Sequence, residues 1–219
     1  GTLFLARQLS EGAASHLASL ALSDRSYLGR TTLPPDLAYL MAMQARVAPG
    51  DIVLDPFCGT ASVLMACATL GATKTVGVDV DASVILGEHE GRNGIERNFE
   101  EAGLCPPPDL IVGDMADIDA LLPLTPGTPG SQCATFDAIV TDPPYGLMEG
   151  LGPFYQPLRE RLTQLLALAC RRLRVGGRLV FLLPLPPSVR AADAFPSQGL
   201  PTSRWLQVET VSRQHLSQR

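Results

Sequence analysis

Four aspartates stand at, or just after, the ends of short apolar runs, and carboxylates in such places are candidates for ligand binding. They are Asp55, Asp79, Asp114 and Asp142. The apolar runs are typical of buried strands, and the carboxyl ends of parallel strands meet at one edge of a sheet, where open α/β proteins bind ligands. A cluster of four carboxylates would repel a phosphate-rich dinucleotide, and no G-x-G-x-x-G follows the first run. The pattern therefore argues against an NAD site and favours a cationic ligand.

S-adenosylmethionine fits such a site on chemical grounds. Its ammonium and sulfonium are positive, its ribose diol requires a carboxylate acceptor and its adenine amine requires another. Asp79 lies 24 positions after Asp55, close to the ~20-residue offset at which an acidic residue meets a ribose in nucleotide-binding folds. Each carboxylate taken alone is more often a turn or helix cap. Four of them in the same position on four strands favour a binding site.

The loop after the first run turns directly into a helix and supplies three more candidates. It reads Asp55-Pro-Phe57-Cys-Gly59-Thr60-Ala-Ser. Gly59 permits close approach of the backbone to a ligand. We expect Phe57, Gly59 and Thr60 to line the cofactor side of the site.

The segment Asp142-Pro143-Pro144-Tyr145-Gly146 suits methylation of an exocyclic amine on a planar ring. Such an amine is a poor nucleophile because its lone pair is delocalised into the ring. Two acceptors, the Asp142 carboxylate and the Pro143 carbonyl, would draw on its hydrogens and favour a pyramidal nitrogen, held by a stiff Pro-Pro backbone. Tyr145 can stack on the base. We expect this segment to be catalytic.

Short apolar runs alternate with helix-length stretches along the chain, and this alternation predicts βαβ units around a parallel sheet that positions these residues. The third helix contains Gly87, Gly91 and Gly94, each of which weakens it by up to ~1 kcal/mol, so we expect it to be broken, with Asp81 as its cap. Two Pro-rich connections, 123–132 and 184–202, are predicted, the first as a flexible surface insertion. The expected strands are 52–54, 75–78, 110–112, 136–140, 179–183 and, more weakly, 206–211; the expected helices are 36–47, 61–70, 82–99 and 157–173.

Composition narrows the class of protein. The chain has 219 residues, of which 46% are apolar and 18% charged, as in globular proteins. No apolar run approaches the ~18 residues of a membrane span, and no secretory signal is evident. The five cysteines are scattered without C-x-x-C spacing, which favours reduced thiols, a cytoplasmic location and no structural metal.

Charge is unevenly distributed along the chain. Residues 1–150 contain 7 Lys or Arg and 19 Asp or Glu, a net charge of −12. Residues 151–219 contain 10 Lys or Arg and 3 Asp or Glu, a net charge of +7, so that the whole chain has −5. The basic part could meet a polyanion or be a solvated helix face with an Arg-rich tail.

The motifs DPFCGT and DPPYG, in this order, resemble those of class I S-adenosylmethionine-dependent methyltransferases that act on amino groups of nucleic-acid bases. More narrowly, the chain is similar to the catalytic domain of tRNA guanine-10 N2-methyltransferases over most of residues 4–183. The matching segments are 6–9 (ARQL), 25–32 (RSYLGRTT), the helix that follows, DPFCGT, GVDVD and FDAIVTDPPYG. The resemblance implies an α/β, Rossmann-like fold with a mostly parallel, doubly wound sheet.

The resemblance also implies roles. Asp55, Gly59, Asp79 and Asp114 would contact the methyl donor, with Thr31 and Thr32 near its methionine end, and Asp142, Pro143 and Tyr145 would hold guanine N2 in line with the donor methyl. The implied partners are a tRNA substrate, a small zinc-binding activator subunit that needs an exposed apolar patch, and a separate RNA-binding module outside this chain. We expect residues 1–33 to be a lead-in segment packed on a catalytic domain of residues 34–219.

Three departures from the family pattern stand out. Ala61 occupies the place of a usual second glycine, 123–132 is an insertion, and the closing antiparallel seventh strand is either cut off or degenerate.

Three rival functions stay open. The first is an adenine N6-methyltransferase, because a D-P-P-Y motif suits the adenine amine equally well. The second is a protein glutamine methyltransferase, for which the resemblance implies Asn in place of Asp142, and the third is a non-catalytic scaffold with the same fold.

Overall fold

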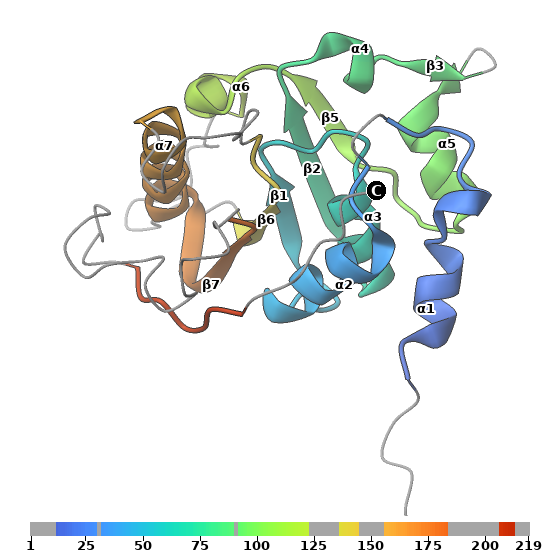
Figure 1. Ribbon diagram of the computed structural model, residues 1–219, viewed down its shortest axis with the longest axis horizontal. Helices are drawn as coiled ribbons and strands as arrows, with labels where there is room; N and C mark the ends of the chain where they lie inside the picture. Colours follow the sequence, from blue (N-terminus) through green and yellow to red (C-terminus); the bar gives the residue numbers. More distant parts are fainter. Residues whose placement is uncertain are drawn as a thin grey trace, which may run out of the picture.

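Five parallel strands form the central sheet, in the order β5-β2-β1-β6-β7 (Figure 1). The computed structural model describes residues 12–29, 32–89, 92–122, 136–144, 156–183 and 206–212. The strands are β1 Ile52–Asp55, β2 Lys74–Asp79, β5 Asp109–Val112, β6 Phe136–Thr141 and β7 Leu173–Phe181. The chain winds outward from β1 in one direction through β2 and β5, and in the other through β6 and β7. The switch point of the topology therefore lies between β1 and β6.

Strand register brings the predicted acidic positions to one edge of the sheet. Asp55 pairs in register with Gly77, two residues before Asp79, and Asp79 pairs with Val112, two residues before Asp114. Asp142 directly follows Thr141, the last residue of β6. The parallel, doubly wound fold class is thus confirmed, and the carboxyl edge of the sheet is where ligand chemistry is expected.

Helices cover both faces of the sheet, and the three central strands β2, β1 and β6 are largely buried, as parallel strands usually are. On one face α2 (Pro35–Gln44), α3 (Ser62–Thr69) and α5 (Gly94–Glu101) pack into a cluster that includes Val53. On the other face α6 (Ile118–Leu121) and α7 (Gln156–Arg172) share a cluster with Leu54. Adjacent residues of β1 thus serve opposite cores because successive strand side chains alternate between faces.

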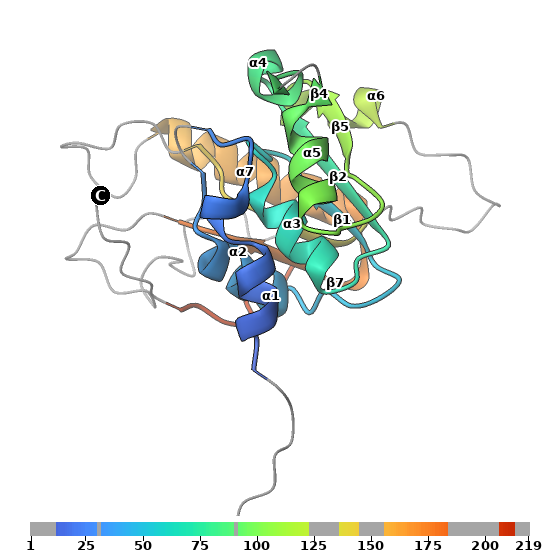
Figure 2. The same ribbon diagram turned by 90° about the vertical axis from the view of Figure 1, so that its right-hand side faces the viewer.

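The N-terminal part of the described chain packs beside the first of these faces. It contains α1 (Ala14–Ser19) and the short 3-10 helix η1 (Leu22–Asp24). Figure 2 shows α1 next to α2, where His16 Nδ1 lies 2.8 Å from the Tyr39 hydroxyl. Leu20 is fully buried in the same apolar cluster as α2 and α3. The division at residue 33 stays a prediction.

The third predicted helix is broken, as expected from its glycines. It divides into α4 (Ala82–Ile85), a hairpin of β3 (Glu88–His89) and β4 (Arg92–Asn93), and α5. Asp81 caps α4 by accepting from the Ser83 N–H at 2.9 Å, which confirms its predicted role. A Cβ at Gly87 or at Gly94 would collide with the Tyr27 side chain. These glycines therefore serve close packing as well as the break.

Two strand predictions at the C-terminal end are wrong in part or whole. β7 begins at Leu173, directly after α7, rather than at Leu179, because Gly176, with φ of +79°, accommodates a shift in the pairing with β6. Residues 206–212 form no strand. Val208 and Val211 stay 55% and 40% exposed, so an ordered strand here would gain little from burial.

Segment 206–212 lies beside β7, where Arg178 Nη2 is 3.6 Å from Glu209 Oε2.

A short 3-10 helix, η2 (Met115–Asp117), joins β5 to α6. The insertion 123–132 and the connection 184–202 lie outside the described residues. None of the helices in the described ranges has the length and apolar character needed to span a membrane.

Candidate functional site

Asp55, at the end of β1, is buried beneath the carboxyl edge with 1% of its surface exposed. Its Oδ1 accepts from the Thr141 hydroxyl at 2.6 Å and from the Phe57 N–H at 3.1 Å. The carboxylate therefore ties the end of β6 to the start of the loop after β1. A direct contact with a ligand was expected of this residue, but its side chain offers almost no surface for one.

Burial sets the charge state of Asp55. Removal from water raises its pKa to about 7, the nearby Asp142 and Asp79 carboxylates raise it further, and the bonds from Thr141 and Phe57 oppose the rise. Asp55 thus changes charge near neutral pH. Thr141, which is fully buried, was not singled out in the sequence, and only its place directly before Asp142 could have drawn attention to it.

Asp79, at the end of β2, holds two backbone segments. Its Oδ2 accepts from the Gly59 N–H and its Oδ1 from the Asp81 N–H, both at 2.9 Å. An ionised carboxylate has about four acceptor positions, so two of them remain for a ligand diol. The residue is only half-buried, which makes it the carboxylate best suited to touch a bound molecule.

The loop after β1 is held close to β2 by its backbone. The Cys58 N–H donates to the Val78 carbonyl at 3.0 Å, and a Cβ at Gly77 would lie 2.7 Å from the Cys58 sulfur. Burial raises the pKa of the Cys58 thiol, as do the Asp55 and Asp79 carboxylates. Cys58 is therefore a packed, protonated thiol rather than a nucleophile.

Two residues of this loop have left-handed backbone conformations, Gly59 with φ of +48° and Ala61 with φ of +63°. Only glycine adopts this region without cost. Ala61 is the N-cap of α3 and is fully buried. The structure thus gives a physical reason for a glycine at position 61 and shows that alanine is accommodated there with strain.

Residues 25–29 and Thr32 lie against the loop and the neighbouring helices. Thr32 Oγ1 is 3.2 Å from Thr60 Oγ1, and it bonds both the N–H and the carbonyl of Gly29. These contacts bring Thr32 and Thr60 together, and the assignment of both residues to the donor side stays a prediction. Thr31 lies outside the described residues.

Arg25, Ser26 and Tyr27 form a clamp that was recognised only as part of a motif. Arg25 is buried and donates to the Ser62 hydroxyl at the start of α3 at 2.7 Å; burial lowers its pKa to about 10. Ser26 donates to Glu101 of α5 at 2.5 Å, and the Tyr27 hydroxyl donates to the Val84 carbonyl of α4 at 3.1 Å. Three consecutive side chains thus attach this segment to three helices.

Asp114 and two apolar residues lie toward the β5 side of the edge. Asp114 is exposed and accepts from the Ala116 N–H at 2.8 Å, which makes it the cap of η2. Val80, after Asp79, is 71% exposed, and Val112, at the end of β5, is 39% exposed. Sequence reasoning missed these valines, although their place at the ends of strands was a usable signal. Together they offer an apolar surface beside two carboxylates.

Asp142, Pro143 and Pro144 follow β6 next to the switch point. Asp142 is partly exposed, Pro143 is buried and Pro144 is exposed. The effect of Asp142 on the pKa of Asp55 shows that the two carboxylates are near each other. Tyr145 lies outside the described residues, so its predicted stacking role is not tested by the structure.

An aromatic and a basic side chain meet on the β6 side of the loop. The Arg161 guanidinium of α7 lies over the Phe57 ring, 6.0 Å from its centroid, within the range of a cation–π interaction. Phe57 is half-buried on the face that α7 covers. A positive group therefore stands beside the loop that follows β1.

Backbone amides, two apolar residues and several carboxylates are therefore the chemistry of this edge. Within the described ranges, no three His, Cys, Asp or Glu side chains are arranged to hold a metal ion. Cys58, Cys67, Cys105 and Cys170 are free thiols. The arrangement can bind a small cation with a diol and an aromatic group, and it can present acceptors to an amine.

Comparison with known proteins agrees with this chemistry. A family model described as RMKL-like, methyltransferase domain, matches residues 23–192, more than half of the chain. The tRNA (guanine(10)-N(2))-methyltransferase TRMT11 of Dictyostelium discoideum is 31% identical over 95% of this chain and 44% of its own length. The tRNA (guanine(10)-N(2))-methyltransferase of Schizosaccharomyces pombe is 31% identical over 85% of this chain and 42% of its own. The chain thus spans less than half the length of these relatives.

Among solved structures, the crystal structure of TrmN from Thermus thermophilus is similar to this one. The TM-score is 0.52 and the identity 26%, over 82% of this chain and 47% of that chain. This likeness agrees with the strand order and the doubly wound sheet.

Proposed function

The chain belongs to the family of RMKL-like methyltransferase domains, and on that premise we propose that it transfers a methyl group from S-adenosylmethionine to the exocyclic N2 amine of a guanosine in tRNA. The observation that carries this proposal is the gathering of Asp55, Asp79, Asp114 and Asp142 at one edge of the sheet, on both sides of its switch point. A cationic donor and a neutral amine acceptor suit such an edge, and a free anion does not.

The donor half of the proposed site lies over β1, β2 and β5. Asp79, with acceptor positions to spare, would bind the ribose diol, and Asp114 would accept from the adenine amine. Val80 and Val112 would pack on the faces of the adenine. Thr32, Thr60, the Gly59 backbone and, by resemblance, Thr31 would lie at the methionine end. Asp55, just beneath, would act on the positive sulfonium through its charge rather than by contact.

The acceptor half lies after β6. The Asp142 carboxylate and the Pro143 carbonyl would accept from the guanine amine, and Tyr145 would stack on the base, with Pro144 stiffening the turn. As the nitrogen–methyl bond forms, the bond from carbon to sulfur breaks and the donor leaves as a neutral thioether. The nitrogen then gives up one proton, which the Asp142 carboxylate is suited to accept. Positioning supplies much of the rate in such a direct displacement.

The choice of guanosine in tRNA is supported by the printed activity of the relatives named above. A separate RNA-binding module and a small zinc-binding activator also belong to the proposal. A cytoplasmic location completes it. The resemblance supports the module and the activator, and the scattered cysteines without C-x-x-C spacing support the location.

The experiment that tests the proposal is transfer of labelled methyl to bulk tRNA and to DNA, followed by nucleoside analysis. It is run with and without a zinc-binding activator, and with and without a separate RNA-binding module. We expect N2-methylguanosine in tRNA alone. N6-methyladenine would replace the proposal by the adenine reaction. A folded chain that binds no donor in calorimetry would favour the scaffold.

Two variants complete the design. Asp142→Ala should be inactive, while Asp137→Asn, which changes a carboxylate at the start of the same strand, should stay active. Equal loss in both would mean that damage to β6, and not the lost acceptor, explains the result.

A further inference from the structure

The arginines of the described chain differ in what they bind. Five of them form ion pairs: Arg97 with Glu101, Arg171 and Arg172 with Asp119, Arg174 with Asp137 and Arg178 with Glu209. Arg25 is buried and bonded to Ser62 and to the Leu20 carbonyl. Among the arginines whose side chains the structure describes, that leaves Arg46 and Arg161 without a carboxylate partner.

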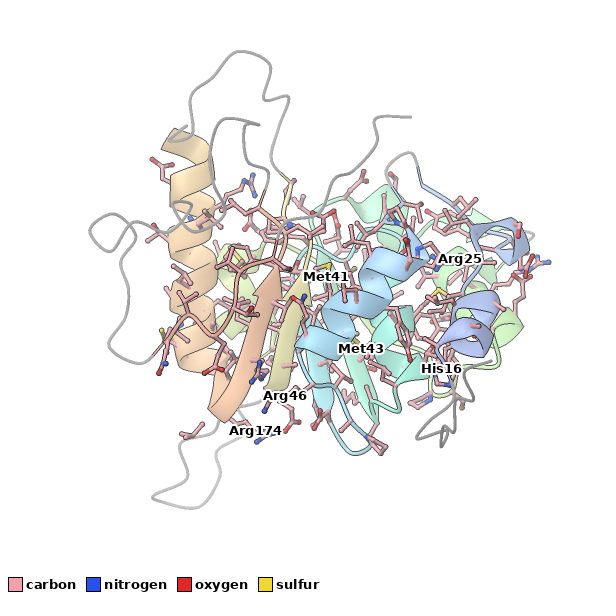
Figure 3. The ribbon with its side chains drawn as sticks, turned by 60° about the horizontal axis from the view of Figure 1, so that its bottom comes forward. His16, Arg25, Met41, Met43, Arg46 and Arg174 are labelled. Carbon is pink, nitrogen blue, oxygen red and sulfur yellow. The ribbon has the colours of Figure 1, made fainter. Side chains whose placement is uncertain are left out.

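These two arginines lie at opposite edges of the sheet. Arg46 follows α2 and precedes β1, at the amino edge, and Figure 3 shows it toward the same end of the sheet as Arg174 of β7. Arg161 is in the first half of α7, which ends where β7 begins. Because α7 runs antiparallel to the strands, its first half lies toward the carboxyl edge, which is the edge of the proposed site.

The contact with Phe57 places Arg161 more closely. α7 packs over β1 and β6 through Leu165, which shares a cluster with Leu54 and Ile139. The Arg161 guanidinium lies 6.0 Å from the centre of the Phe57 ring, in the loop after β1. Arg161 is exposed, and its N–H groups make no hydrogen bond or ion pair within the described part of the chain. An exposed cation is thus held beside the acidic edge with its donors unused.

The proposed substrate creates a need for such a cation. A nucleotide that enters the site carries phosphates on both sides of its base, and the carboxylates of the edge repel them. An arginine presents several N–H donors in a planar fork that matches a phosphate group. Stacking on Phe57 restricts the side chain without using these donors, so less freedom is lost when a phosphate binds.

From these observations we propose that Arg161 is a substrate-binding residue, which holds a backbone phosphate of the RNA next to the target nucleotide. The inference rests on the proposed function, because it assumes an RNA substrate at the carboxyl edge. It adds a specific contact that none of the motifs contains. It also assigns a task to one member of the basic C-terminal third of the chain.

The test compares Arg161→Gln with Arg46→Gln, which removes the same charge at the opposite edge. Affinity for a tRNA transcript is measured by fluorescence anisotropy at several salt concentrations. We expect Arg161→Gln to weaken binding roughly 3- to 10-fold at low salt and to lower the slope of log K against log salt by about 1. Arg46→Gln should change neither quantity, and Arg161→Lys should keep the salt dependence but lose part of the affinity, because lysine has the charge without the planar fork.

Three results would overturn the inference: equal effects of the two Gln variants, no effect of Arg161→Gln, or a wild-type chain that binds no tRNA at any salt. The proposed function fails separately. If tRNA binds through Arg161 but no tRNA is methylated under any condition, the phosphate contact stands and the reaction does not. Donor affinity, measured by calorimetry, should be the same in all variants, since a lower value would mean that the loop at Phe57 was disturbed.

Discussion

The two edges of the sheet treat their aspartates differently. At the amino edge, Asp109 at the start of β5 bonds Lys74 at 2.7 Å, and Asp137 near the start of β6 pairs with Arg174. At the carboxyl edge, Asp79 and Asp114 accept from backbone N–H groups, and Asp55 from a hydroxyl and a backbone N–H. No Lys or Arg of the described residues forms an ion pair with these three.

The difference separates neutralised carboxylates from charged ones. An ion pair cancels the field of an aspartate at a distance, whereas a backbone N–H orients the group and leaves its net charge. The carboxyl edge therefore keeps a negative potential that a cationic donor can use. Residue type alone does not mark an aspartate as functional; its partners do.

Removal of Asp142 should give the largest effect at the carboxyl edge. In Asp142→Ala, methyl transfer should fall by about 10³-fold or more, because an acceptor that acts on the reacting amine is lost. Donor affinity should stay within about threefold of wild type, since the donor half lies over other strands. Initial rates at saturating donor and calorimetry of donor binding check the two parts. Lost binding in a folded variant would contradict this division of roles.

Asp55 is the only one of the three carboxyl-edge aspartates Asp55, Asp79 and Asp114 that is buried, so its charge state affects the stability of the fold. Its pKa is about 7 in the fold, raised from 3.8 chiefly by burial. Between these two values the folded state holds a proton that the unfolded state has lost, so stability falls as pH rises, by about 1.4 kcal/mol per pH unit. Below pH 3.8 the buried carboxyl group is neutral in both states and stability is not reduced, and above pH 7 the full loss of stability from its ionisation is reached.

Asp55→Asn should remove this dependence. The amide oxygen can still accept from Thr141 and Phe57, and no charge is buried. Relative to the variant, the wild type should lose about 2 to 3 kcal/mol of unfolding free energy between pH 5 and pH 7. Urea unfolding of both proteins at each pH unit measures it. Parallel curves for the two proteins would show that Asp55 is ionised throughout.

Asp79→Ala should weaken donor binding by roughly 10- to 30-fold, which corresponds to about 1.4 to 2 kcal/mol for hydrogen bonds to a charged group. The loop after β1 also loses its bond from the Gly59 N–H. Calorimetry of donor binding is the measurement. If the variant binds donor normally and is slow only at saturating donor, the assignment of Asp79 to the ribose is wrong.

Much of the fold and the edge could be predicted, because both depend on local patterns. Short apolar runs that end in aspartate place β1, β2, β5 and β6 and their carboxyl ends correctly, and glycines mark the break before α5. The segment 206–211 contains Leu206, Val208 and Val211 with the same apparent pattern, but the fold leaves its valines exposed. A pattern shows which residues could be buried and not whether a neighbour is there to bury them.

The contacts that distinguish one aspartate from another could not be predicted. Asp55 and Asp79 both end strands, yet Asp55 is closed in by Thr141, 86 positions away, and Asp79 is not. The bond from Arg25 to Ser62 likewise joins positions 37 apart. Such partners depend on the packing of the whole sheet, which no local window of sequence contains.

A substitution at the amino edge should have the smallest effect on donor binding and stability. Its result decides whether the aspartates of the two edges differ in function. The side chains of Lys74 and Asp109 are 51% and 59% exposed, so Asp109→Asn should cost about 0.2 to 1 kcal/mol of stability. Donor affinity and methyl transfer should be unchanged, because Lys74 already cancels this charge. If Asp109→Asn weakened donor binding as much as Asp79→Ala, net charge alone would govern the donor, and the partners of each carboxylate would not matter. Calorimetry of both variants at two salt concentrations separates these cases, since a diffuse field is screened within about 10 Å at 0.1 M salt and a direct contact is not.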